Sequence, residues 1–139
     1  MLSIQSPEDV VSISMYNILS SRINEPEFNE LVINWNKNIV VDIKPFYPLT
    51  IIFEGNEIKF KIGDLKKADL KIRIHVKDLL DMAYGRSNLI IAVLTRKLRI
   101  KGIYRIGTLL KFYKIIFKTM KMVAANPNNN YFEQNKETR

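Results

Sequence analysis

The stretch ADLKIRIHVKDLLDMAYGRSNLIIAVLTRKLRIKG, residues Ala68–Gly102, decides the fold of this chain. Apolar and basic residues alternate near both of its ends, in Leu70–Ile74 and again in Lys97–Lys101. Strict alternation is typical of a β-strand that buries one face and exposes the other to solvent. The stretch therefore predicts one strand on each side of a largely apolar middle.

The apolar middle predicts two short helices. We expect the first over Lys77–Tyr84, ended by Gly85, because glycine commonly follows a helix C-terminus. We expect the second over Leu89–Leu94, because Asn88 is a suitable N-terminal cap. The stretch contains no recognisable nucleophile, metal cluster or phosphate loop, so its composition favours a protein that holds an apolar ligand.

The residues before this stretch predict two helices followed by three strands. The first helix follows Ser6-Pro7-Glu8-Asp9, with Ser6 as its cap, and the second begins near Pro26. A hairpin turn is expected at Glu54–Glu57, where glycine and asparagine tolerate a positive φ. The three strands are expected at Ile39–Ile43, Leu49–Phe53 and Ile58–Ile62.

The longest predicted helix covers Ile106–Ala125 and carries a narrow stripe of basic residues, Lys111, Lys114, Lys118 and Lys121. Its apolar residues span well over half of the circumference, whereas a surface helix usually has an apolar arc of about 100°. The surplus apolar surface must meet another helix, a ligand, a partner chain or a membrane. An ordinary core helix is the alternative interpretation.

Strands grouped together, with helices outside them, predict an α+β fold. We expect a five-stranded, mostly antiparallel sheet with helices over one face. Residues 1–125 are expected to form a single domain, and residues 126–139 a polar, disordered tail.

The composition excludes several classes of protein. The 139 residues suffice for one hydrophobic core, and 47% hydrophobic and 26% charged residues are ordinary for a globular domain. The absence of cysteine excludes a disulfide framework, a thiolate zinc site and a cysteine nucleophile. The N-terminus lacks the features of a signal peptide, and no apolar run reaches the roughly 18 residues of a transmembrane helix. We therefore expect a cytoplasmic protein.

The net charge of +8 is unevenly distributed. Ten basic residues and no acidic residue lie between Asp81 and Glu133, whereas the other twelve basic residues and all fourteen acidic residues lie elsewhere. Such asymmetry predicts an anionic partner, such as a membrane surface, a lipid head group, a coenzyme phosphate or a nucleic acid. A solvated face that only aids solubility is the alternative.

The sequence offers no candidate catalytic residue, metal site or cofactor site. His75 is the lone histidine and has no clustered partners, so we expect a surface position at a strand end. Asp78 and Asp81 lie near a helix start, where acidic side chains are electrostatically favourable. The pair Gly102 and Gly107 is not followed by Lys and Ser or Thr, as a phosphate loop requires.

Several short motifs, taken in order, resemble the sterol carrier protein type-two family, whose members are small sterol-transfer or lipid-transfer domains. The resemblance covers roughly Ile39–Val123. It departs from the family at His75, where a serine-like cap is usual, and after Gly102, where the family often has Gly-Asp. The matching residues are Phe53–Gly63 in the hairpin, Ala68-Asp69-Leu70, Asp78-Leu79-Leu80, Gly85, Ala92 and Leu98–Gly102.

The resemblance implies an apolar tunnel between the five-stranded sheet and its helices, holding a fatty acid, fatty acyl-CoA, sterol or isoprenoid-like lipid. It implies that the two short helices and the last helix line this tunnel. The candidate lining residues are Leu79, Met82, Ala83, Ile91, Leu94, Leu109, Phe112, Tyr113, Ile116 and Met120. The alternative for each is ordinary core packing.

The leading hypothesis is therefore non-enzymatic lipid binding and transfer, with transient contact to a membrane. The second hypothesis is an accessory module that presents a lipid-like intermediate to a biosynthetic enzyme. Nucleic acid is not an expected partner, because the basic helix lacks stacking aromatic residues and a recognised module. The residues expected to contact an anionic membrane or ligand head group are Arg105, Lys111, Lys114, Lys118 and Lys121.

Overall fold

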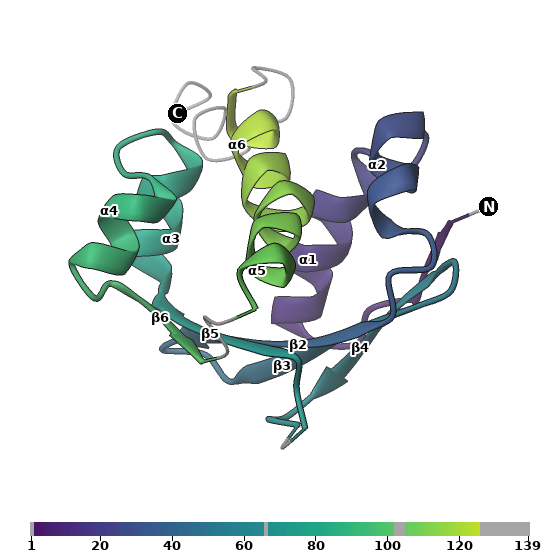
Figure 1. Ribbon diagram of the computed structural model, residues 1–139, viewed down its shortest axis with the longest axis horizontal. Coiled ribbons are helices and arrows are strands. Elements are labelled where there is room, and N and C mark those ends of the chain that lie inside the picture. Colours follow the sequence, from purple (N-terminus) through teal and green to yellow (C-terminus); the bar gives the residue numbers. More distant parts are fainter. Residues whose placement is uncertain (1, 66, 102–104, 126–139) are drawn as a thin grey trace, which may run out of the picture.

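The computed structural model describes residues 2–65, 67–101 and 105–125, which form one curved sheet with every described helix packed on the same face (Figure 1). The α+β class is therefore as predicted. The strands are β1 (Ser3–Ile4), β2 (Lys37–Lys44), β3 (Pro48–Glu54), β4 (Glu57–Ile62), β5 (Leu70–His75) and β6 (Leu98–Lys101). The helices are α1 (Val10–Ser20), α2 (Pro26–Val32), α3 (Val76–Ala83), α4 (Leu89–Leu94), α5 (Ile106–Phe112), the π-helical segment η1 (Tyr113–Phe117) and α6 (Lys118–Ala125).

The sheet corrects the prediction of five mostly antiparallel strands. It has six strands in the order β1-β4-β3-β2-β5-β6, and two of its five pairings are parallel. The strand that was not predicted is β1, which pairs with β4 at the edge of the sheet. It has two residues, which is too short to show an alternating pattern in the sequence. The central pairing of β2 with β5 is parallel because the chain crosses from β4 over two strands before it enters β5.

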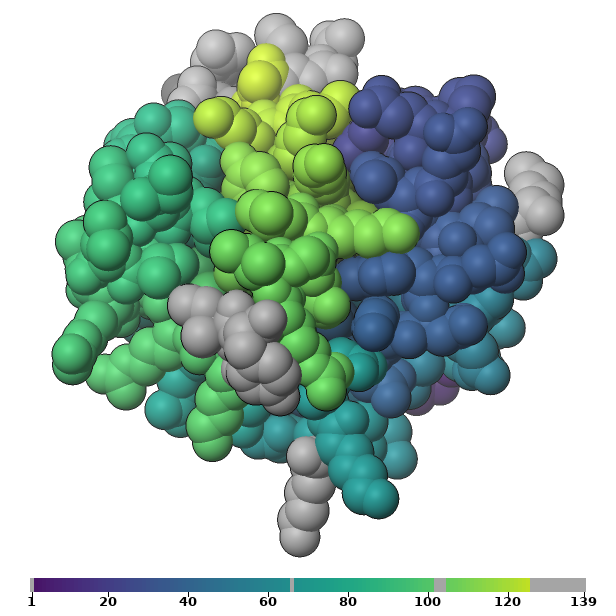
Figure 2. All heavy atoms as spheres, viewed as in Figure 1, coloured from purple at the N-terminus to yellow at the C-terminus, as the bar shows by residue number. Residues whose placement is uncertain are grey.

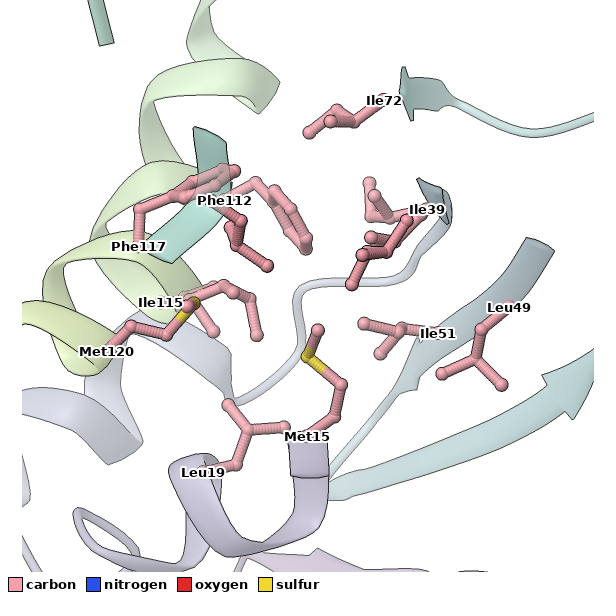
Figure 3. Packing of buried hydrophobic residues seen from close by; sticks show 14 of the residues in the cluster. Met15, Leu19, Ile39, Leu49, Ile51, Ile72, Phe112, Ile115, Phe117 and Met120 are labelled. Atoms are coloured by element: carbon pink, nitrogen blue, oxygen red, sulfur yellow. The ribbon is translucent and has the colours of Figure 1, made fainter. Parts of the chain in front are cut away.

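The sheet face under the helices is apolar because alternate residues of each strand point to it. In β2, Ile39, Val41 and Ile43 belong to the buried core, and they lie beside Leu70, Ile72 and Ile74 of β5 in register. Figure 3 shows the side chains of Phe112 and Ile115 directed toward these strands from the helix layer. The core of the domain therefore lies in a single layer between the sheet and the helices.

Two helix starts differ from the prediction. The cap of α1 is Asp9 rather than Ser6, and Asp9 forms a reciprocal capping box with Ser12, so the helix begins at Val10. The cap of α3 is His75, whose Nδ1 accepts a hydrogen bond of 3.1 Å from the backbone N–H of Lys77. Nδ1 of His75 thus fills the capping role in which a serine-like residue is usual.

Other local predictions are confirmed. Asn88 caps α4 through a 2.9 Å hydrogen bond from the Ile91 N–H, and Pro26 occupies the first turn of α2. The β3–β4 hairpin turns at Gly55, whose φ of 60° is in the left-handed region that glycine adopts easily. Gly85 follows α3 with a φ of 80°.

The last helix spans Ile106–Ala125 as predicted, but one turn of it is π-helical. In η1 the N–H of Lys118 bonds to the carbonyl of Tyr113, five residues earlier. We call α5, η1 and α6 together the central helix, because they run continuously between the α3–α4 pair and the two N-terminal helices (Figure 1). The prediction that residues 1–125 form one domain stays a prediction, and the predicted tail, 126–139, lies outside the described residues.

Candidate functional site

The apolar layer between the central helix and the sheet is the candidate site. Seven of the ten predicted lining residues are brought together in this layer, and all seven are buried members of the core. They come from two elements, α3 and the central helix, whose α6 part contacts α3. The seven are Leu79, Met82, Ala83, Leu109, Phe112, Ile116 and Met120.

The other three predicted lining residues lie elsewhere. Tyr113 is half-buried, and its ring stacks against that of Phe117 with the centroids 6.1 Å apart. Ile91 and Leu94, on α4, are exposed. The resemblance suggested Ile91 and Leu94 as the lining residues of this helix, whereas the side of α4 that packs inward is the opposite one, which includes the buried Ala92.

The buried arc of the central helix is wide at its π-helical turn. Ile115, Ile116 and Phe117 are consecutive and all buried, so neighbouring elements cover this turn on more than one side. The Phe117 ring meets the Phe112 ring edge-on, with the centroids 6.1 Å apart. The wide apolar arc seen in the sequence therefore packs toward the sheet, toward the N-terminal helices α1 and α2, and toward α3.

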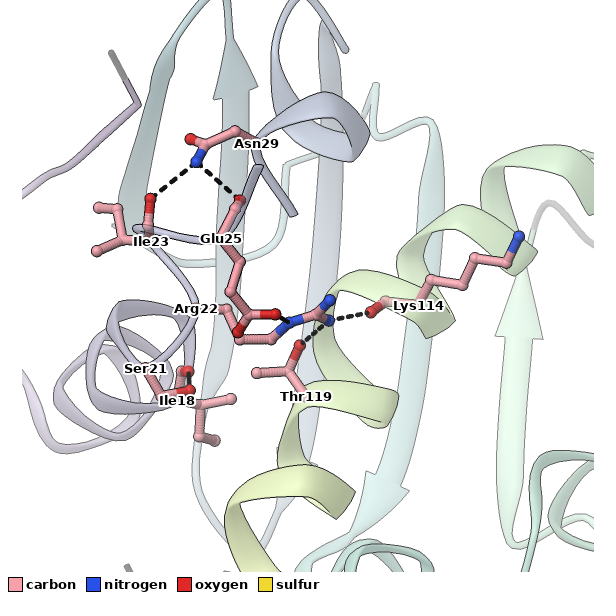
Figure 4. A network of polar contacts seen from close by, with 8 residues as sticks. All are labelled: Ile18, Ser21, Arg22, Ile23, Glu25, Asn29, Lys114 and Thr119. Carbon is pink, nitrogen blue, oxygen red and sulfur yellow. Dashed lines mark hydrogen bonds and ion pairs between the residues drawn. The ribbon is translucent and has the colours of Figure 1, made fainter. Parts of the chain in front are cut away.

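A buried arginine fixes the central helix beside this turn (Figure 4). The Arg22 guanidinium is 4% exposed and donates from Nη1 to Oγ1 of Thr119 at 3.0 Å and to the Lys114 carbonyl at 3.4 Å. It also pairs with Glu25 and lies 5.1 Å from the centre of the Phe28 ring. The sequence interpretation did not predict a role for Arg22. The available signal was its position three residues after the apolar Leu19, which places the two side chains on the same face of a helix.

The five residues predicted to contact an anionic partner do not form one equivalent set. Lys114, Lys118 and Lys121 are exposed along the central helix, which crosses the face shown in Figure 2. Lys111 is half-buried, with its ammonium 5.4 Å from the centre of the Trp35 ring. Arg105 pairs with Asp69 at 2.7 Å. The freely solvated part of the predicted stripe is thus its C-terminal half.

The described residues contain no group of three or more side chains suited to hold a metal ion. His75 is exposed and occupied as a helix cap, and Asp81 pairs with Arg86 at 2.9 Å. Within the part of the chain that the structure describes, no helix is long and apolar enough to cross a membrane.

The comparison that decides the family covers most of the chain. The model of the SCP-2 sterol transfer family matches residues 17–116. The chain belongs to this family. The resemblance to the sterol carrier protein type-two family is therefore confirmed, and with it the general class of lipid-binding and lipid-transfer domains. SCP-2 domains are generally non-catalytic lipid-binding modules.

Solved structures of this SCP-2 fold share little sequence identity with the chain. The UbiJ-SCP2 ubiquinone synthesis protein is 15% identical with a TM-score of 0.60, and the match covers 88% of this chain and 99% of that one. The sterol carrier protein domain 2 of Helicoverpa armigera is 19% identical with a TM-score of 0.60, covering 84% of this chain and 93% of that one. No curated protein matches the sequence significantly.

The SCP-2 fold also occurs inside a larger enzyme. The stereoselective inverting sec-alkylsulfatase Pisa1 from Pseudomonas sp. is 12% identical with a TM-score of 0.54, and the match covers 63% of this chain but 14% of that one. At these identities the likenesses concern the fold alone.

Proposed function

We propose that this SCP-2 domain binds and transfers a lipid without catalysing a reaction. The observation that carries the proposal is the apolar layer in which α3 and the central helix bring seven of the ten candidate lining residues together against the sheet. The cargo is a single-chain or ring lipid: a fatty acid, a fatty acyl-CoA, a sterol or an isoprenoid. Burial of its hydrocarbon supplies the affinity, at roughly 0.8 kcal/mol per CH₂.

The contact between α3 and α6 is the proposed route by which the lipid enters. Met82 on α3 and Met120 on α6 are both buried at this side of the core, and unbranched thioether side chains change rotamer readily. A lipid chain can therefore insert by displacing flexible side chains, while the aromatic pair Phe112 and Phe117 keeps the deeper core packed. The exposed Lys114, Lys118 and Lys121 on the same helix provide cations for an anionic head group.

A transfer assay tests this proposal. The protein is stripped of lipid and mixed with donor vesicles that carry a fluorescent fatty acid and with acceptor vesicles that carry a quencher. The proposal predicts that quenching accelerates in proportion to protein concentration and that the purified complex retains the probe. A rate equal to that of vesicles alone, with no probe bound to folded protein, contradicts it.

A second candidate is an accessory module that presents a lipid-like intermediate to a biosynthetic enzyme. It is favoured by the likeness to the UbiJ-SCP2 ubiquinone synthesis protein, which extends over 99% of that chain. Here the bound lipid stays with the domain until a partner enzyme takes it, in the cytoplasm or at a membrane surface. Stable capture of such an enzyme, together with lipid binding but no transfer between vesicles, favours this candidate over the first.

A further inference from the structure

Helix α4 exposes an unusually large apolar face for so short an element. Ile90 is 70% exposed, Ile91 48% and Leu94 77%. Their spacing of one and four residues places the three side chains on one side of the helix. The opposite side carries the buried Ala92 and the partly buried Leu89 and Val93, which pack on the core. The outward direction of the apolar face therefore follows from the inward packing of the opposite side of α4.

The surroundings of this apolar face are basic. Arg86 precedes α4, and Arg96 and Lys97 follow it directly; all three are exposed. Within the part of the chain that the structure describes, Arg96 and Lys97 form no ion pair, while Arg86 pairs with Asp81. The sequence contains no acidic residue from Met82 to Ala125. An exposed aliphatic cluster with solvated cations around it is complementary to an anionic membrane, whose acyl chains lie beneath negatively charged head groups.

We propose that α4 is the element through which this domain docks on an anionic membrane, with Ile90, Ile91 and Leu94 inserted among the acyl chains and Arg96 and Lys97 at the phosphates. The proposal deepens the proposed function, since it names where a lipid-carrying domain meets its membrane. An interfacial helix lies in the plane of the membrane with its apolar face buried by roughly 5–10 Å, which is the orientation in which Ile90, Ile91 and Leu94 would all enter the bilayer together.

A protein partner fits this face less well than a membrane. A stable protein interface buries about 800 Å² on each side and engages some 20–30 residues, far more than one six-residue helix provides. Helix α4 stands at the outer end of the helix layer, beyond α3 (Figure 1). Because α3 is joined to α4 by the turn at residues 84–88, docking brings the proposed entrance beside α3 close to the bilayer.

Vesicle co-sedimentation of the full chain tests the proposal. Vesicles of phosphatidylcholine with about 30% phosphatidylglycerol are compared with pure phosphatidylcholine vesicles, since the anionic lipid attracts the cations. The double variant I90S/L94S should bind the anionic vesicles roughly tenfold less than the unmodified chain, because the inserted apolar area is lost. The variant R96Q/K97Q should lose binding to anionic vesicles and change little on neutral ones.

Matched controls are available on other elements. I33S/I62S removes two exposed apolar side chains after α2 and at the end of β4, and K61Q/K67Q removes two exposed cations from β4 and the segment that follows it. Both controls should bind vesicles like the unmodified chain. Thermal unfolding checks that each variant is folded. In a Leu94→Trp variant, the new indole should enter the bilayer, so the fluorescence should shift to shorter wavelength with anionic vesicles and not with neutral ones.

Unchanged vesicle binding by folded I90S/L94S overturns the proposal, as does an equal loss in I33S/I62S. A third result also overturns the proposal. If the unmodified chain binds no vesicles but self-associates, and I90S/L94S abolishes that self-association, the apolar face of α4 binds a second copy of the chain. Lipid content measured on the same samples keeps the two hypotheses apart. If the unmodified chain carries lipid but I90S/L94S docks on vesicles as well as it does, only this inference is contradicted. If the unmodified chain docks through α4 but carries no lipid, only the proposed function is contradicted.

Discussion

Nη1 of Arg22 lies 3.0 Å from Oγ1 of Thr119, and this buried hydrogen bond joins the end of α1 to the start of α6. The same nitrogen reaches the Lys114 carbonyl inside the π-helical turn. A charged donor thus satisfies polar groups that the apolar interior would otherwise leave unpaired. The position of the central helix above the sheet depends on this contact as well as on apolar packing.

Replacement of Arg22 by Ala should lower the free energy of unfolding by about 2 kcal/mol, because a charged hydrogen bond is lost and Thr119 Oγ1 is left without its donor. The guanidinium packing on Phe28 is lost as well. Urea unfolding measures the change. Lys118→Ala, on the exposed side of the same helix, is the control and should change stability by less than about 0.5 kcal/mol. Equal effects of the two substitutions would contradict the structural role of Arg22.

Enlargement of Ala83 should reduce the amount of lipid that the domain carries. Ala83 is buried on α3, at the side of the core where the lipid is proposed to enter. Ala83→Leu fills space that the lipid chain needs, and the expected cost in stability is about 1–3 kcal/mol. Binding of a fluorescent fatty acid measures the effect. Ala125→Leu, at the exposed end of α6, should bind normally; full lipid binding by folded Ala83→Leu would remove α3 from the site.

Asp9 makes the stability depend on pH in the acid range. Burial raises the pKa of Asp9, but hydrogen bonds from Ser12 and Tyr47 outweigh it and hold the pKa below its ordinary value. A lowered folded-state pKa stabilises the fold above the unfolded-state pKa of about 3.9, and this contribution is lost as the pH falls through the folded-state value.

Asp9→Asn keeps a good helix cap but removes the charge. The variant should be less stable than the unmodified chain by less than about 1 kcal/mol near pH 7, since the group is partly solvated, and the difference should vanish near pH 2. Denaturant unfolding at several pH values measures it. A difference that is the same at every pH would show that Asp9 acts only as a cap.

Asp42 is a buried carboxylate on the sheet face away from the helices. Its Oδ2 lies 3.2 Å from Nε of Arg73 and 3.4 Å from Nζ of Lys44, while Oδ1 has no hydrogen bond among the described residues. Arg73→Gln should cost about 1–2 kcal/mol, because the buried charge loses its nearer partner. A double-mutant cycle with Asp42→Asn should give a coupling energy of about 1 kcal/mol. Additive effects would mean that the pair contributes nothing to the fold.

The strands and most helices were predictable because their signals are local. The residues of Leu70–Ile74 alternate because one face of the strand is buried and the other is solvated. Asn88 and Pro26 indicate helix starts, because an asparagine side chain caps a free backbone N–H and proline fits the first helical turn. The pairing of β1 with β4 was not predictable, because a two-residue strand has no period. The cap of α1 was predicted at Ser6 and lies at Asp9, because the side chains of Asp9 and Ser12 each bond to the other's backbone N–H.

The candidate site was predictable in part. The residues of α3 and the central helix that the resemblance suggested as lining lie together in the buried core, apart from the half-buried Tyr113, and their role in lipid binding stays a prediction. Ile91 and Leu94 are exposed and lie apart from that group; the sequence of α4 did not indicate this, because a helix that is apolar all round gives no information about which side faces inward. Arg22 and the π-helical turn depend on contacts between distant parts of the chain, which no local pattern records.

Native mass spectrometry of the purified chain, followed by extraction of what it carries, tests the central claim most directly. The account predicts a complex heavier than the chain by one lipid, released on denaturation and identified as a fatty acid, acyl thioester, sterol or isoprenoid. The Ala83→Leu variant should carry less of it than the Ala125→Leu control. A folded chain that is free of lipid, and that takes up none of these lipids when they are offered, would contradict the account.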